Sequence, residues 1–524
     1  MKERILSSLL TVLALSYLQA QTAAIPPVPR LVVGVTIDQL RTDYLEAFSV
    51  LYGEKGFKRL WKEGRVYNNV EYNFSPIDPA SALASIYTGT APSKNGITGN
   101  QWLDRSTLRV VTCVDDKDYG GVFTVENTSL KNLQVSTLTD ELKVATQGRS
   151  IVYSISPRRE EAVIAAGHAG NGAYWLNDLT GKWCSSSYYG KVPPRWLMVY
   201  NENTGVDKRI DEIIWEPLYP LDVYDNSSDN VGFKYSFSDA RKYRSLKVSP
   251  CINEEVNRLA EACLYGTMLG ADPVTDFLAI GYNAGSYQRE SGEFSFIEMQ
   301  DTYARLDNDI ANLLDLIDKK VGLQNTLFFI TSTGYIDNPV KEDVSYRIPT
   351  GDFYMNRAVA LLNMYLMAVY GEGQYVEAYN GLQIYLDHKL IEKKQLRLKD
   401  VLERCSEFLT DLSGVQRVYT SYDLTLGTWS PILDRVRNAF YSRTSGDILL
   451  EVCAGWKLKD ADSKDITTVR QAHVNFPLFF YGTGINAGHI NSSITTEYIA
   501  PTLALLMRIR APNACTSFPI EGIR

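Results

Sequence analysis

The stretch LVVGVTI at residues 31–37 is the part of the sequence that most directly indicates the fold. It is a continuous apolar run rich in β-branched residues. Such a run is typical of a strand buried on both faces, as in a parallel sheet that carries helices on each side. Four later runs have the same character, at residues 150–156, 276–282, 326–331 and 477–481.

A helical pattern lies between two of these runs, at residues 299–321. Its apolar positions step by three or four residues and form one buried stripe: Met299, Tyr303, Leu306, Ile310, Leu313, Ile317 and Val321. Strands that alternate with helices predict a doubly wound α/β fold, with a mostly parallel sheet flanked by helices.

Two stretches interrupt this alternation, and we interpret both as insertions that cap the carboxyl ends of the strands. Residues 171–250 are rich in Tyr, Trp, Ser, Asn and Asp, and residues 341–470 mix helical and strand-like patterns. The core of the predicted domain is therefore built from residues 30–170, 251–340 and 471–524.

The N-terminus has the pattern of a secretory signal peptide. Lys2 and Arg4 precede a mostly apolar stretch at residues 5–18, and Ala20 closes it. The stretch is shorter than the roughly 20 residues that span a membrane, and so is the apolar run at 358–370. We expect residues 1–20 to be removed, residues 21–524 to form the mature domain, and no transmembrane segment to remain.

Composition excludes two classes of protein. The 53 Lys and Arg against 61 Asp and Glu give a net charge of −8, and a general nucleic-acid binder needs a basic face instead. None of the seven Cys forms a CxxC pair, so no zinc ribbon or CxxC redox motif is indicated. We therefore expect no nucleic-acid partner.

Several motifs resemble the alkaline phosphatase superfamily. They include LVVGVTIDQLRTDYL at 31–45, YTGTAPSKNGITGN at 87–100, AGHAGNGAYW at 166–175 and SGDILLEVCAGW at 445–456. The nearest branches are the secreted bacterial phosphate-irrepressible alkaline phosphatases and the type I phosphodiesterase/nucleotide pyrophosphatases. The resemblance implies a hydrolase with two zinc ions, held by Asp and His at the strand ends, and a Thr or Ser nucleophile at the start of a helix.

The sequence departs from that pattern at the nucleophile. Counting back from the YTG motif places Pro79 where the hydroxyl residue should stand, and proline suits a first helical turn. Ser75, Ser81 and Ser85 are nearby, and we interpret each as a cap or a polar residue on a helix face. Asp38 stands at the first metal-ligand position, with the cap of the following helix as the alternative interpretation.

The other metal-ligand positions are also altered. The resemblance places them at Ser286, Glu290, Thr333, Gly334 and Asn475. Zinc prefers imidazole among its ligands, and a site of this type needs three His. The chain has only His168, His388, His473 and His489, and of these only His473 is near a ligand position. We therefore expect the zinc pair to be lost and no cofactor to be bound.

Part of a phosphate pocket is retained. Asn100 matches the family's Asn that hydrogen-bonds a phosphoryl oxygen, and Arg158 matches a phosphate-binding Lys. Glu160 occupies the position of a phosphate-binding Arg and would repel a phosphate dianion. Arg159 compensates if the register shifts by one residue. Alternatively, residues 158–161 are a solvated loop of mixed charge.

These features favour an exported pseudoenzyme over an enzyme. The expected role is binding or assembly in the cell envelope, with an unknown envelope protein or small ligand as partner, in the periplasm, at the outer surface or secreted. Two alternatives remain open. One is an active phosphatase or phosphodiesterase with a rearranged single-metal site and a serine or water nucleophile; the other is a purely structural envelope subunit.

Overall fold

Strand β1 (Leu31–Asp38) lies inside an 11-stranded sheet. In this computed structural model, which describes residues 27–224, 232–285, 296–335, 351–453, 456–459, 466–467 and 475–523, β1 pairs in parallel with a strand on each side. The sheet has the order β21-β2-β20-β12-β1-β11-β6-β7-β8-β5, with β22 beside β2. Its short outer strands are β21 (Gly488–Ile490), β22 (Ile494–Thr495) and β5 (Gly121–Val122). The central members are β6 (Val152–Ile155), β11 (Asp276–Asn283), β12 (Thr326–Ser332), β2 (Arg65–Glu71) and β20 (Phe476–Gly482).

The predicted mostly parallel sheet is confirmed. Strands β12, β1, β11, β6 and β7 (Gly172–Leu176) are parallel neighbours, whereas β20 runs antiparallel to both β12 and β2. Two strands from the first predicted insertion, β7 and β8 (Trp183–Ser186), extend the central sheet. The boundaries of the insertions stay a prediction.

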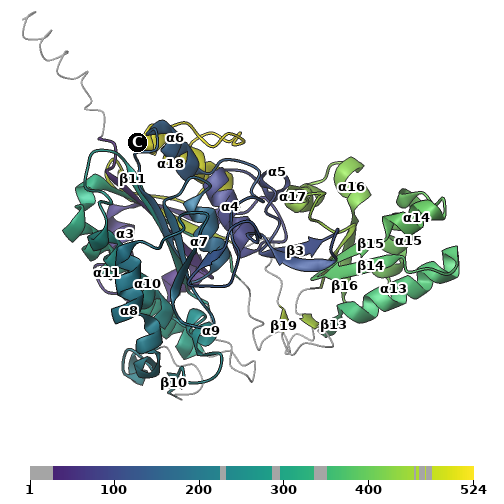
Figure 1. Cartoon of the computed structure of the whole chain (residues 1–524), viewed down its shortest axis with the longest axis horizontal. Helices are drawn as coiled ribbons and strands as arrows, with labels where there is room; N and C mark the ends of the chain where they lie inside the picture. The colour runs from purple at the N-terminus through teal and green to yellow at the C-terminus, as the bar shows by residue number, and fades with distance from the viewer. Residues whose placement is uncertain are drawn as a thin grey trace, which may run out of the picture.

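Helices cover both faces of the sheet because side chains alternate along each strand. Leu31, Val33, Val35 and Ile37 pack into one apolar core, and Val32 packs into the other. The first core is completed by α3 (Phe57–Glu63), α8 (Arg195–Asn203), α10 (Cys251–Gly266) and α11 (Phe296–Lys320). The second is completed by α4 (Pro79–Thr88), α6 (Leu138–Ala145), α7 (Arg159–Ala166) and α18 (Ile499–Met507) (Figure 1).

The predicted stripe at 299–321 is the buried face of helix α11. Six of its seven positions are buried, and Val321 packs against the same core. None of the helices in the described part of the chain is long and apolar enough to cross a membrane.

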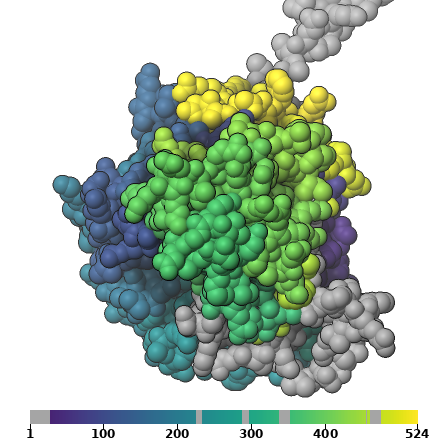
Figure 2. Space-filling view, turned by 90° about the vertical axis from the view of Figure 1, so that its right-hand side faces the viewer, coloured from purple at the N-terminus to yellow at the C-terminus, as the bar shows by residue number. Residues whose placement is uncertain are grey.

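A smaller lobe, residues 351–453, has its own apolar core and lies to the right of the main sheet in Figure 1. Its four-stranded sheet has the order β14-β15-β17-β16, and Figure 2 shows this lobe in front of the remainder of the molecule. Its elements are β14 (Val376–Asn380), β15 (Gln383–Leu386), β16 (Val415–Thr420), β17 (Ile448–Val452), α13 (Met355–Tyr370), α14 (His388–Lys393), α15 (Leu398–Thr410), α16 (Ser421–Leu426) and α17 (Pro431–Ala439).

Candidate active site

The carboxyl ends of the parallel strands meet at one edge of the sheet and bring Asp38 and Thr333 together. The backbone N–H of Ala284, after β11, donates to the Asp38 carbonyl at 2.8 Å, and that of Gln39 donates to the Gly334 carbonyl at 3.0 Å. The Thr333 hydroxyl donates to Asp38 Oδ1 at 2.9 Å. This is the edge at which ligands bind in open α/β sheets.

Asn475 lies at the same edge. It directly precedes β20, which runs antiparallel to β12 and pairs Leu478 with Thr331. The start of β20 is therefore level with the end of β12, where Thr333 and Gly334 follow the strand. Asp38, Thr333 and Asn475 thus lie at the ends of three neighbouring strands, β1, β12 and β20.

A guanidinium faces Asp38. Arg158 Nη1 lies 3.0 Å from Asp38 Oδ2 and 3.6 Å from Glu161 Oε1. The Asp38 side chain is 3% exposed and that of Arg158 is 32% exposed, so the carboxylate is buried and the guanidinium is partly accessible to solvent. Burial alone lowers the pKa of Arg158, but the carboxylates of Asp38 and Glu161 outweigh that effect and raise it, which keeps the positive charge fixed.

Helix α4 begins at this edge with Pro79 as its first residue. Asp78 caps the helix, because its Oδ1 accepts from the Ala80 N–H at 2.9 Å. The same N–H also donates to Asn100 Oδ1 at 3.2 Å. Only an amide oxygen can accept this bond, so the Asn100 Nδ2 end is the one that can donate to a ligand.

Two of the three nearby serines have hydrogen-bond partners for their side chains. Ser81 completes the capping box of α4, and Ser85 shares a hydrogen bond of 3.0 Å with Thr496; both serines are fully buried. Ser75 lies before α4, where its backbone N–H donates to the Arg435 carbonyl of the smaller lobe. The interpretation of Ser81 as a capping residue is confirmed.

The interpretation of residues 158–161 as a solvated loop is wrong, because Arg159 begins helix α7 and is 8% exposed. Its Nη2 donates to Thr112 Oγ1 at 2.6 Å and to Asp115 Oδ1 at 2.9 Å. Glu160 Oε1 lies 3.3 Å from Arg159 Nε. Arg159 is thus committed to other carboxylates and does not share the place of Arg158 beside Asp38.

The described residues alone do not fit a pair of zinc ions. Within them, no three His, Cys, Asp or Glu side chains gather closely enough to hold a metal. His168 is bonded to Asp140 at 2.8 Å, and His388 to Asp447 at 2.9 Å. The predicted positions Ser286 and Glu290 and the nearby His473 lie outside the described residues.

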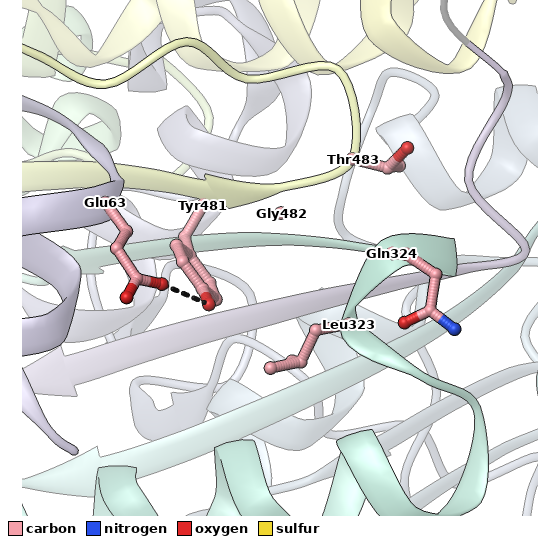
Figure 3. A pocket seen from close by; sticks show the side chains of 6 residues that line it. All are labelled: Glu63, Leu323, Gln324, Tyr481, Gly482 and Thr483. Carbon is pink, nitrogen blue, oxygen red and sulfur yellow. Dashed lines mark hydrogen bonds between the residues drawn. The ribbon is translucent and has the colours of Figure 1, made fainter.

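A separate surface hollow lies at the opposite edge of the sheet (Figure 3). It sits where β12 begins and β20 ends, and the Tyr481 hydroxyl donates there to Glu63 Oε2 at 3.1 Å. The parallel strands β1 and β12 begin at this end of the sheet, so the hollow is not the site around Asp38, which lies where those strands finish. Its lining residues are Glu63, Leu323, Gln324, Tyr481, Gly482 and Thr483.

Comparison with known proteins identifies close relatives. The chain is 32% identical to alkaline phosphatase PafA of Elizabethkingia meningoseptica, over 98% of both chains, and 30% identical to alkaline phosphatase PhoV of Synechococcus elongatus, over 93% of this chain and 91% of the relative. The crystal structure of wild-type PafA superposes with a TM-score of 0.84 at 31% identity and covers 95% of this chain and 99% of that one.

These matches overturn two predictions. The predicted loss of phosphoester hydrolysis is wrong, because the chain aligns almost from end to end with proteins named as alkaline phosphatases. The prediction that no cofactor is bound is wrong for the same reason, because the superfamily that these relatives represent is one of two-zinc hydrolases. Both predictions counted missing Thr and His residues, and such a count measures departure from a standard site, not the capability of an altered one.

The comparison also shows which family the chain belongs to. The family model described as type I phosphodiesterase / nucleotide pyrophosphatase matches residues 32–475. This range includes Asp38, Pro79, Asn100 and Arg158, so the altered positions lie inside the matched region and not beside it. The chain belongs to the type I phosphodiesterase/nucleotide pyrophosphatase family.

Proposed function

We propose that the protein is an exported phosphoric ester hydrolase with a rearranged site at the carboxyl ends of β1, β6 and β12. The observation that carries this proposal is the end-to-end similarity to alkaline phosphatases, at 32% identity over 98% of the chain. The retained cluster of Asp38, Asn100 and Arg158 around the start of α4 supports it. Export is supported by the basic and apolar N-terminal pattern of residues 1–20.

In the proposed reaction, the guanidinium of Arg158 and the amide Nδ2 of Asn100 bind the phosphoryl oxygens. Water is the nucleophile, because Pro79 has no hydroxyl and Ser81 is held in the capping box. Asp38 accepts a proton from the attacking water as its oxygen bonds to phosphorus. The P–O bond to the leaving alcohol breaks, and the proton passes to the alcohol oxygen, so that a diester and water give a phosphomonoester and an alcohol, and a monoester and water give phosphate and an alcohol.

Charge around Arg158 favours phosphodiesters over phosphomonoesters. Four carboxylates raise its pKa, those of Asp38, Glu161, Asp78 and Glu160, although burial alone lowers it. A monoester carries close to two negative charges near neutral pH and a diester carries one. Each extra negative charge costs more beside an acidic surrounding. We expect kcat/KM to be at least tenfold higher for the diester, which corresponds to about 1.4 kcal/mol.

The test is hydrolysis of p-nitrophenyl phosphate and bis-p-nitrophenyl phosphate by purified protein, with and without added zinc. Arg158→Gln removes the phosphate-binding charge. Arg397→Gln is the matched control, because Arg397 is 80% exposed and pairs with Asp400 on the smaller lobe. We expect wild type and the control to hydrolyse the diester at equal rates and Arg158→Gln to be at least tenfold slower. No turnover by wild type, or equal turnover by all three, would refute the proposal.

A further inference from the structure

The smaller lobe contacts the core along the segment that carries Asn100. Residues 96–105 lead from α5 (Pro92–Asn95) through Asn100 into strand β3 (Gln101–Asp104), and residues 441–447 lead from α17 towards β17. The Thr98 and Thr444 hydroxyls are hydrogen-bonded at 3.2 Å. Beyond Asn100, Arg105 Nη2 donates to the Ser445 carbonyl at 3.0 Å. The two segments therefore run side by side, with contacts on both sides of Asn100.

The strongest of these contacts is an ion pair between Arg105 and Asp447. Arg105 Nη1 lies 3.1 Å from Asp447 Oδ2, and the guanidinium lies over the Tyr385 ring at 4.8 Å. The Asp447 side chain is only 4% exposed. It also accepts from the Leu386 N–H at 2.8 Å and contacts His388 Nε2 at 2.9 Å. Asp447 is thus a firmly held anchor, since its side chain is bonded to β15 and α14 and its carbonyl accepts from the N–H of Ser421, the first residue of α16.

The anchor is connected to Asn100 by a short, stiff ribbon. Strand β3 pairs antiparallel with β4 (Arg109–Thr112), from Gln101↔Thr112 to Asp104↔Arg109. The N–H of Cys113 donates to the Asn100 carbonyl at 2.8 Å and extends the ribbon by one residue. Asn100 and Arg105 are five residues apart, which is about 16 Å along a strand. Hydrogen bonds along that length prevent the two ends from moving independently.

The smaller lobe also holds the other flank of α4. The Arg435 carbonyl accepts from the Ser75 N–H at 3.1 Å, and Asn438 Nδ2 donates to the Asn73 carbonyl at 3.0 Å. Residues 73–75 lead into the cap of α4, and Asn100 bonds to the first turn of that helix. The start of α4 is therefore fixed between two contacts with one lobe.

We propose that Arg105 and Asp447 are positioning residues for phosphoryl binding: their ion pair docks the β3–β4 ribbon on the smaller lobe and so fixes the amide of Asn100 at the site. The proposal rests on the proposed function only in taking Asn100 as a phosphoryl-binding group. It assigns the smaller lobe an indirect part in the site, because the ion pair acts through Asn100 and does not touch the substrate.

The test is a double-mutant cycle on inorganic phosphate affinity, measured by calorimetry. Asp447→Asn removes one charge at constant size, and Arg105→Gln removes the other with a shorter side chain. We expect each to weaken phosphate binding about tenfold, and Asn100→Ala to weaken it at least as much. The combination of Arg105→Gln with Asn100→Ala should be no weaker than Asn100→Ala alone, because the pair acts through that amide. Arg397→Gln should bind phosphate as wild type does.

Additive losses in the cycle, or unchanged affinity in Arg105→Gln, would overturn the proposal. Calorimetry needs no turnover, so the result is independent of whether the protein hydrolyses esters. Where Arg105→Gln does not fold, Arg105→Lys serves instead, since it keeps the charge but loses the planar two-pronged contact.

Discussion

Replacement of Asp38 by Asn tests the proposed chemistry at its centre. The change keeps the size of the side chain, and the new amide oxygen can still accept from Thr333. It removes the proton acceptor and the charge that faces Arg158 at 3.0 Å. A positioned general base contributes roughly 10²–10⁴ in rate. We therefore expect kcat/KM to fall by that factor, which is about 2.7–5.5 kcal/mol of transition-state stabilisation.

The stability cost of the same variant should be much smaller than its kinetic cost. Arg158 is 32% exposed, so water can solvate the guanidinium once the carboxylate is gone. We expect a loss of about 1–2 kcal/mol, between the values for exposed and for buried pairs. Diester hydrolysis and urea unfolding are measured on the same preparation. A folded Asp38→Asn protein with kcat/KM within threefold of wild type would refute Asp38 as the proton acceptor.

Three further predictions concern stability. Gly34→Ala should lose about 1–3 kcal/mol in urea unfolding, because its Cβ would lie 2.5 Å from Phe329 Cε1; no measurable loss would contradict the packing. Burial raises the pKa of Asp276 to about 6, so the stability that its protonated form contributes should be lost as the pH rises from 4 to 7. Asp276→Asn should flatten that decline in thermal unfolding. The hydrogen bond to Asp447 raises the pKa of His388, so this stabilisation is present below pH 6.5 and lost above it; an unchanged pH profile in His388→Gln would contradict this.

The fold was largely predictable because its central strands are continuous apolar runs. The direction of β20 was not, since a run buried on both faces looks the same whichever way it points. Strands β7 and β8 were also missed as members of the central sheet. Their sequences, GAYWL and WCSS, are short and lie in a Tyr- and Trp-rich stretch that suggested a cap. Length and composition do not report which edge of a sheet such strands extend.

The site was predictable where a single strand end determines a position. Asp38 directly follows an apolar run, and Thr333 and Gly334 follow another, so their meeting at one edge is a consequence of parallel pairing. The contact between Asp38 and Arg158 was not predictable. The two residues are 120 positions apart, and although the resemblance assigned Arg158 to the phosphate pocket, the charges of segment 158–161 alone do not show which arginine faces Asp38 and which faces Asp115.

The side chain of Arg158 can serve the base and the substrate at once. Its Nη1 faces Asp38 and Glu161, and a guanidinium has further N–H donors on Nη2 and Nε, five in all. A phosphoryl group bound by those remaining donors would not need to displace Asp38. The planar guanidinium would instead hold the carboxylate and the phosphoryl oxygens at a fixed separation, which is the geometry that attack by a water between them requires. The ion pair between Arg158 and Asp38 is therefore compatible with the proposed hydrolysis.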